Sequence, residues 1–162
     1  MHALARLYIA KGTVSSRYDA ALWLDRAIHR EPDNAEYRLT RARLYWLLGE
    51  STQAHRQVRR ILDVHPDQAE ALYLMGRHSA SAMMRYLDVE KVEYVYEGAD
   101  VSKWTPFSME DFTAEDRDKA ISYLTRALEA DPGHEPAMTL LGLVYYEAGL
   151  LDRLIDLFEG YL

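Results

Sequence analysis

The chain has 162 residues, of which 49% are hydrophobic, and its 19 Lys and Arg against 26 Asp and Glu give a formal net charge of -7. This length and apolar fraction suffice for one folded domain or a short array of repeated units, whereas the negative charge repels a phosphate backbone and argues against nucleic acid as a partner. The chain has no cysteine, so it forms no disulfide and offers no thiolate ligand or nucleophile.

The N-terminal stretch MHALARLYIAKG does not resemble a signal peptide, because Arg6 and Lys11 interrupt a short apolar run. No apolar run elsewhere approaches the length of a membrane span. We therefore expect a soluble chain that does not insert into a membrane. The sequence leaves its compartment open, with the cytoplasm favoured.

Two helical hairpins are predicted first, over residues 1–34 and 35–68, because Pro32 and Pro66 lie 34 residues apart and each follows a helix. In each unit a glycine ends the first helix, since glycine readily adopts the left-handed conformation found after helices. The first unit has three extra residues in its turn. The recurring residues are Leu4, Ala5, Tyr8, Gly12, Ala20, Leu24, Ala27 and Pro32 in the first unit, and Arg41, Ala42, Tyr45, Gly49, Ala54, Val58, Ile61 and Pro66 in the second.

A third hairpin is predicted over residues 69–134, with an insertion at about 81–113 between its two helices. The unit begins with Ala71, Leu72, Met75 and Gly76 and finishes with Ala120, Leu124, Ala127 and Pro132. Within the insertion, residues 89–96 are rich in Val and Tyr and fit a helix or a strand, and helix is favoured because the run has no hairpin signal. A complete degenerate repeat is the alternative, but Asp88 and Pro106 fall where a small residue and a helix are required.

The fourth hairpin is predicted over residues 135–162, and its opening EPAMTLLGLVYYEAG repeats the pattern of AEYRLTRARLYWLLG at 35–49. Its recurring residues are Leu141, Gly142, Tyr145, Gly149, Leu154, Phe158 and Tyr161. Helix starts are predicted at Asp33, Asp67 and Thr113, because each precedes an acidic residue by three positions, as in a capping box or a variant of it.

This pattern resembles the tetratricopeptide repeat, whose period is about 34 residues. The resemblance covers roughly four fifths of the chain. It implies an all-α fold, a right-handed α-solenoid (superhelix) of about four helix-turn-helix hairpins, in which stacked neighbours bury the apolar faces and leave an extended concave groove. It also implies a protein-protein interaction scaffold, without catalytic activity, that binds a peptide or protein segment in that groove.

The groove-facing position of the first helices is held by Arg6, Arg43, Arg77 and Leu143, and the resemblance places Leu39, Trp46, Tyr73 and Tyr146 beside them. Guanidinium groups bind carboxylates in a fork and stack on aromatic rings, which suits a protein-binding surface. Residues 1–65 carry 11 basic and 7 acidic side chains, net +4, so the bound segment is predicted to be acidic, although ordinary solvated surface gives the same asymmetry. Trp46 and Tyr146 fit the helical core equally well.

Two further expectations concern the site. Trp104, Phe107, Met109 and Phe112 of the insertion are too apolar to remain in water, and their segment, residues 86–118, has 10 acidic and 3 basic side chains, net -7. We expect them to pack on the concave side or its rim. The basic and amide clamp of repeats that bind chaperone tails is not expected, because Thr40 and Glu70 stand where it requires other groups.

Catalytic and metal sites are not predicted. The six histidines never fall at ligand spacing, and carboxylate pairs such as Asp116 with Asp118, or Glu110 with Asp111, have no apolar pocket to separate their acidities. A glycine-rich phosphate loop is also missing from the sequence. We expect no enzyme activity, no metal and no cofactor.

The last helix, LLDRLIDLFEGYL, carries more apolar residues than its own hairpin can cover: Leu150, Leu151, Leu154, Ile155, Leu157, Phe158, Tyr161 and Leu162. The sequence therefore predicts a homo-oligomer through this helix, or a chain that continues beyond Leu162. A structural module for assembly is accordingly the alternative function.

Overall fold

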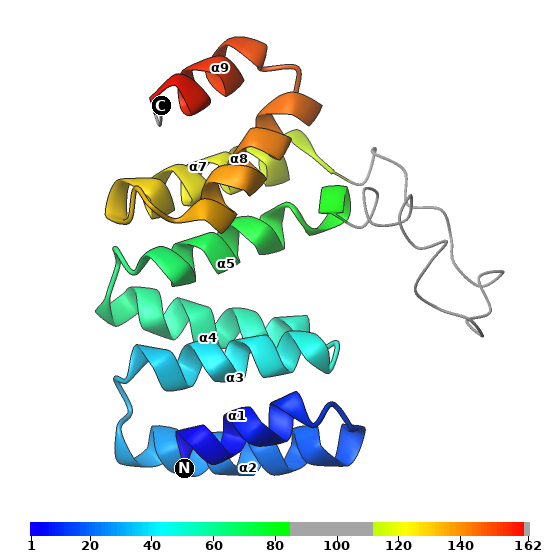
Figure 1. Ribbon diagram of the computed structural model, residues 1–162, viewed down its shortest axis with the longest axis vertical. Helices are drawn as coiled ribbons and strands as arrows, with labels where there is room; N and C mark the ends of the chain where they lie inside the picture. The colour runs from blue at the N-terminus through cyan, green and yellow to red at the C-terminus, as the bar shows by residue number, and fades with distance from the viewer. Residues whose placement is uncertain (85–111, 161–162) are drawn as a thin grey trace, which may run out of the picture. The chain divides into compact units, whose positions relative to one another are not determined.

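A computed structural model of the chain describes residues 1–84 and 112–160, and these residues form helices joined by short turns (Figure 1). No strand occurs among the described residues. The chain divides into two compact units, Met1–Ala71 and Leu72–Leu162. The predicted fold class, an all-α array of helical hairpins, is confirmed.

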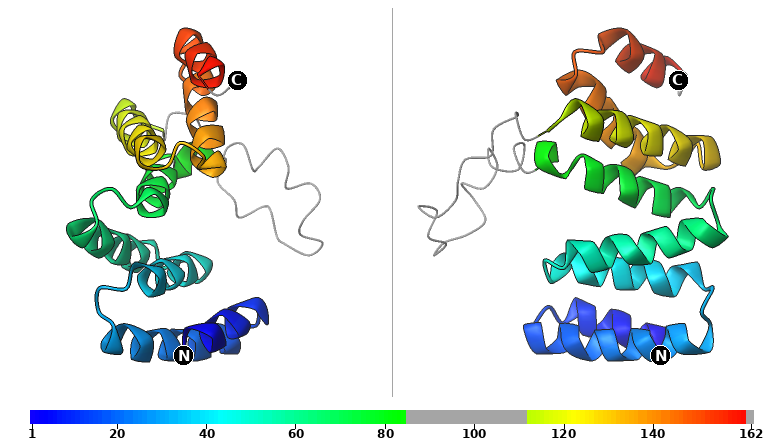
Figure 2. Two further views of the ribbon diagram at one scale, coloured as in Figure 1. Left: turned by 60° about the vertical axis from the view of Figure 1, so that its left-hand side comes forward. Right: turned by 180° about the vertical axis from the view of Figure 1, so that it is seen from behind.

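The first unit contains two hairpins, which can be followed in Figure 2. Helix α1 (His2–Ala10) packs on α2 (Val14–Arg30), and α3 (Ala35–Leu47) packs on α4 (Ser51–Val64). Helix α2 also packs on α3, so the second helix of one hairpin contacts the first helix of the next. A shared core joins α1, α2 and α3 and consists of Ala5, Ala20, Leu24 and Leu44, each at most 1% exposed.

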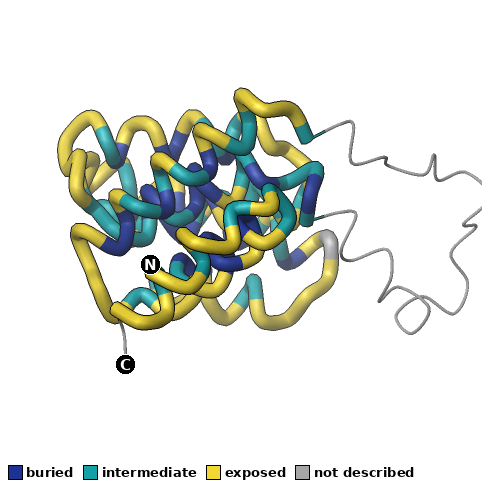
Figure 3. Tube along the Cα trace, turned by 90° about the horizontal axis from the view of Figure 1, so that it is seen from above, coloured by how far each residue is buried: buried dark blue, intermediate teal, exposed yellow. Residues whose placement is uncertain are grey.

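The second unit contains most of α5 (Ala69–Ser79), together with α7 (Ala114–Ala130), α8 (Glu135–Glu147) and α9 (Leu151–Glu159). Helix α7 packs on α8, and α8 packs on α9. Helix α5 comes so close to α7 that a Cβ atom added at Gly76 would lie 2.6 Å from Leu124 Cγ. Buried and exposed residues alternate along the helices (Figure 3), as expected where one side of each helix faces a core.

The predicted helix ends agree with the structure. Gly12, Gly49 and Gly149 follow first helices and have φ values of 76°, 78° and 68°, a conformation that strains any residue with a Cβ atom. Each second helix that precedes a proline ends two residues before it, at Arg30, Val64 or Ala130. The residue before a proline disfavours the helical conformation, which explains this common end point.

Two predicted helix starts are wrong by one residue. Helix α3 is capped by Asn34 rather than Asp33, because the Tyr37 N–H donates to Asn34 Oδ1 at 3.3 Å and the Asn34 amide donates to Glu31 Oε2 at 2.9 Å. At the start of α5 the Ala71 N–H likewise donates to Gln68 Oε1, one residue after the predicted Asp67. The predicted cap at Thr113 is confirmed, since Thr113 Oγ1 accepts from the Asp116 N–H at 3.1 Å.

Candidate functional site

The positions predicted to face a partner follow the small residues of the first helices. Ala5 and Ala42 are fully buried, and Gly76 and Gly142 are buried as well. One residue further on, a helix has turned by about 100°, so the next side chain leaves the packed interface. The residues at these next positions are all exposed, namely Arg6, Arg43, Arg77 and Leu143.

The residues predicted to flank the arginines differ in how far their side chains are exposed. Tyr146 is 62% exposed, and Trp46 and Tyr73 are partly buried. Leu39 is only 7% exposed, because it lies three residues before Ala42 and therefore shares the buried side of α3. The expectation that Leu39 offers surface to a partner needs correction, since it is a core residue.

The site residues are divided between the two units. Arg6, Leu39, Arg43 and Trp46 belong to the first unit, and Tyr73, Arg77, Leu143 and Tyr146 belong to the second. Within the first unit α1 and α3 are in contact, because His2 Nε2 lies 2.8 Å from Thr40 Oγ1 and the His2 ring centroid lies 4.9 Å from that of Tyr37. Arg6 lies about one helical turn after His2. Because α1 contacts α3, Arg6 and Arg43 lie on neighbouring first helices.

Arg43 already binds a carboxylate. Its Nη2 lies 2.5 Å from Glu70 Oε1, with the Arg43 side chain 54% exposed and the Glu70 side chain 25% exposed. Sequence reasoning missed this ion pair, although a signal was present. Glu70 precedes Arg77 by seven residues and Glu36 precedes Arg43 by seven, a spacing of about two helical turns that places acid and arginine on one face.

A second arginine fixes α3 against α2. Arg41 forms an ion pair with Asp25 of α2, and its Nε and Nη2 donate to the Tyr45 hydroxyl at 3.1 and 2.8 Å. The Arg41 side chain is only 18% exposed, whereas the Asp25 side chain is 48% exposed, so these groups extend from the hairpin stack to its surface. They hold α3 in the orientation that presents Arg43.

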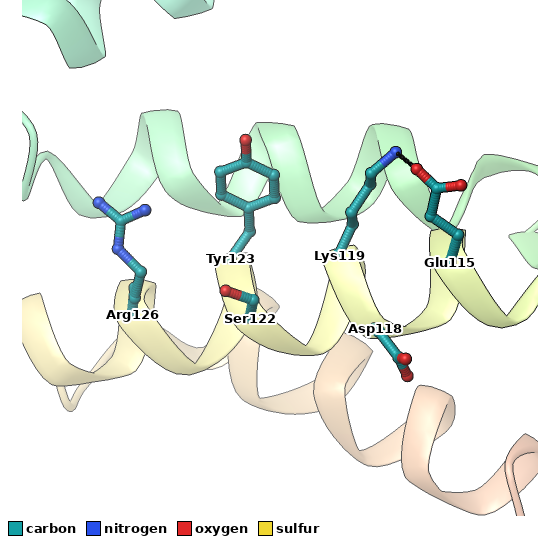
Figure 4. Close-up of a pocket in the computed structure, with 6 residues that line it drawn as sticks. All are labelled: Glu115, Asp118, Lys119, Ser122, Tyr123 and Arg126. Atoms are coloured by element: carbon teal, nitrogen blue, oxygen red, sulfur yellow. Dashed lines mark hydrogen bonds and ion pairs between the residues drawn. The ribbon is translucent and has the colours of Figure 1, made fainter.

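The outer side of α7 carries a shallow hollow lined by Glu115, Asp118, Lys119, Ser122, Tyr123 and Arg126 (Figure 4). Lys119 Nζ donates to Glu115 Oε1 at 2.5 Å, whereas Asp118 points to the other side of the helix (Figure 4). Arg117 binds Asp118 through Nη2 at 2.9 Å. These two carboxylates are therefore solvent-exposed and paired with cations.

Neither a metal-binding cluster nor a membrane-spanning helix occurs among the described residues. No three His, Asp or Glu side chains gather there in a group able to hold a metal ion. None of the helices in that part of the chain has the length and apolar character needed to span a bilayer.

The insertion is largely outside the described residues. Its predicted element at 89–96 and the side chains of Trp104, Phe107 and Met109 all fall within residues 85–111. Phe112, directly before the cap Thr113, is described and is partly buried.

Comparison with known proteins supports the interpretation of the hairpins. The family model described as Tetratricopeptide repeat matches residues 17–77 and 112–153. A solved crystal structure of MamA is similar with a TM-score of 0.41 and 20% sequence identity, over 93% of this chain and 89% of that chain. No curated protein sequence matches the chain significantly. The matched segments amount to more than half of the chain, and with the small residues, turns and stacked hairpins described above they show that it belongs to the tetratricopeptide repeat family.

Proposed function

We propose that this chain binds an acidic peptide or protein segment through the exposed arginines Arg6, Arg43 and Arg77. Tetratricopeptide repeats generally mediate protein-protein interaction and are typically not catalytic. The observation that carries the proposal is the ion pair between Arg43 and Glu70, in which the exposed guanidinium group of a first helix holds a carboxylate.

The geometry of Arg43 suits exchange of one carboxylate for another. Its side chain is 54% exposed, so an incoming carboxylate can reach the guanidinium from solvent. Glu70 then acts as an internal competitor, because each carboxylate satisfies the same donors. Arg6 and Arg77 are exposed at equivalent positions of their own helices.

Apolar groups of the first helices offer further contact area in each unit. Tyr146 is 62% exposed and Leu143 is 37% exposed, while Trp46 and Tyr73 keep part of their rings accessible. Rings of this kind give contact area and stack with guanidinium groups. We therefore expect the bound segment to alternate acidic and apolar residues rather than to be uniformly acidic.

Fluorescence anisotropy tests this proposal with a labelled peptide of alternating Glu and Leu, and with the same peptide carrying Gln for Glu. The wild-type chain should bind the Glu peptide, and added salt should weaken the binding because exposed charges are screened. The double variant Arg43→Glu, Arg77→Glu should lose it. The matched control Arg56→Glu, Arg59→Glu makes the same change of charge at two exposed residues of α4 and should bind as the wild type does. Equal loss in both variants would show that net charge alone attracts the peptide.

Removal of the internal competitor gives a second and opposite test. In Glu70→Gln the carboxylate on Arg43 is replaced by a neutral amide, so the Glu peptide should bind more tightly. An exposed ion pair contributes roughly 0.2 to 1 kcal/mol, which corresponds to a gain of at most about fivefold in affinity. Unchanged or weaker binding would contradict competition between Glu70 and the peptide at Arg43.

A structural role in assembly is the second candidate function. It is favoured by the apolar residues that α1 and α9 leave exposed, and it uses neither Arg43 nor Arg77.

A further inference from the structure

Helix α9 leaves apolar side chains in solvent. Leu151 is 54% exposed, Ile155 is 53% exposed and Phe158 is 45% exposed, and no residue of this helix is buried. Tyr161 and Leu162, which the sequence analysis included in this apolar surface, lie outside the described residues.

The other second helices bury the position that Phe158 occupies. Phe158 follows Gly149 by nine residues, just as Val58 follows Gly49, so the two side chains have the same place in their hairpins. The residues at this place in α2, α4 and α7 are Leu24, Val58 and Leu124, and all three are 0% exposed. Leu24 shares its core cluster with Leu44 of α3. Among the described residues, α9 therefore has no counterpart of the first helix of a following hairpin.

Helix α1 leaves the complementary surface uncovered. Leu7 lies two residues after the small residue Ala5 and is 67% exposed. Leu44 and Val144 lie two residues after the small residues of α3 and α8, Ala42 and Gly142, and they are 1% and 0% exposed. Leu4 is 42% exposed, whereas its equivalent Leu141 is 2% exposed. These first helices pack against a preceding second helix, α2 or α7, and α1 has no such helix before it among the described residues.

The charges of the two helices are opposite. Helix α9 contains Asp152, Asp156 and Glu159 against Arg153, whereas α1 and the residue after it contain Arg6 and Lys11 and no acidic residue. Contact between α1 and α9 therefore brings unlike charges together, and contact between two α9 helices brings like charges together. The charges favour a pairing of unlike ends.

We propose that α1 of one copy of this chain packs on α9 of a second copy, and so continues the stacking of hairpins from one molecule to the next. Leu7 then covers Phe158 and Ile155, as Leu44 covers Leu24 within the chain. The contact joins two different surfaces, so each pair of molecules keeps an unused α1 and an unused α9, and association proceeds beyond the dimer or closes into a ring. The contact is independent of peptide binding at Arg43 and Arg77.

Two substitutions each prevent contact at one of the two end surfaces, that of α1 or that of α9. Leu7→Glu places a carboxylate on the uncovered side of α1, and Ile155→Glu does the same on α9. Ile155 is the better choice than Phe158, because Phe158 Cζ would lie 3.1 Å from a Cβ atom at Gly142 and so packs within its own hairpin. Both new residues are acidic, so the two altered ends repel each other and cannot pair.

Light scattering coupled to size-exclusion chromatography gives the readout. The mass of the wild-type protein should rise with concentration to more than twice the 18.7 kDa of one chain. Each variant alone should remain a monomer. An equimolar mixture should form a species of two chains and stop there, because only the intact α1 of Ile155→Glu and the intact α9 of Leu7→Glu can meet.

Leu22→Glu is the matched control, since Leu22 is an apolar residue of α2 with 61% exposure that lies outside both end surfaces, and it should associate as the wild type does. Far-UV circular dichroism verifies that each variant is folded. A wild-type protein that is monomeric at every concentration overturns the proposal. Self-association of Leu7→Glu but not of Ile155→Glu would instead show that α9 meets α9, and a mixture that stays monomeric would show that the two ends do not pair.

Discussion

Replacement of Gly76 by alanine tests how closely α5 packs on α7. The added Cβ would lie 2.6 Å from Leu124 Cγ, 2.8 Å from Leu124 Cδ2 and 3.4 Å from the Ala120 carbonyl oxygen. Leu124 is 0% exposed, so its side chain cannot give way by moving into solvent. Overpacking of this kind costs about 1 to 3 kcal/mol, and the higher helix propensity of alanine returns about 1 kcal/mol. We expect Gly76→Ala to lower the free energy of unfolding by about 1 kcal/mol.

Gly142→Ala is the matched comparison, because Gly142 holds the same position in α8. The nearest atoms to its added Cβ are Phe158 Cζ at 3.1 Å and Phe158 Cε2 at 3.2 Å. The Phe158 ring is 45% exposed and can move outward, so the gain in helix propensity dominates and stability should rise by up to about 1 kcal/mol. Urea unfolding followed by far-UV circular dichroism should move the two midpoints in opposite directions. A midpoint for Gly76→Ala at or above that of the wild type would refute the reasoning from close packing.

Three further predictions concern single contacts. Thr113→Ala removes the side-chain cap of α7 and should cost about 1 kcal/mol in urea unfolding, and no loss would show that another group caps the helix. Tyr45→Phe removes the hydroxyl that accepts two N–H groups of Arg41, so the same assay should show a loss of about 1 to 2 kcal/mol. The hydrogen bond to Glu115 raises the pKa of Lys119. The contribution of this contact to the stability of the folded protein is therefore present below the pKa that Lys119 has in the unfolded chain, and it is lost as pH rises through the pKa that Lys119 has in the folded protein. Glu115→Gln should lower the pKa of Lys119 in an NMR titration, and an unchanged value would show that Glu115 is not its main cause.

The assembly proposal and the peptide-binding proposal can be tested separately, because the substitutions that test them change different side chains. Substitution at Ile155 should change the mass in solution and leave affinity for the Glu peptide intact. Substitutions at Arg43 and Arg77 should do the reverse. A chain that assembles end to end would also present several copies of its arginine surface, and binding to a partner with repeated acidic segments would then gain from multivalency.

The sequence by itself determined the class of the fold and the places where its helices end. Glycine after a first helix and proline after a second helix act on the backbone of their immediate neighbours, so Gly49 and Pro66 have the same effect whatever surrounds them. The small residues Ala42 and Gly76 could be recognised for a similar reason, since their repeat spacing marks where two helices approach. The arginine positions followed from the same register, and the structure finds Arg6, Arg43 and Arg77 exposed.

Only the tertiary structure decided which partners these residues meet. Arg43 and Glu70 lie 27 residues apart in the chain, and their side chains meet only in the folded structure. Leu39 was expected at the surface and is buried, because one residue rotates a helix position by about 100° and the width of the buried side depends on the neighbouring helix. The sequence of α9 showed an excess of apolar residues, but the structure showed which of them its own hairpin leaves uncovered. Local rules fix where a helix begins and ends, whereas exposure and pairing depend on the helices packed against it.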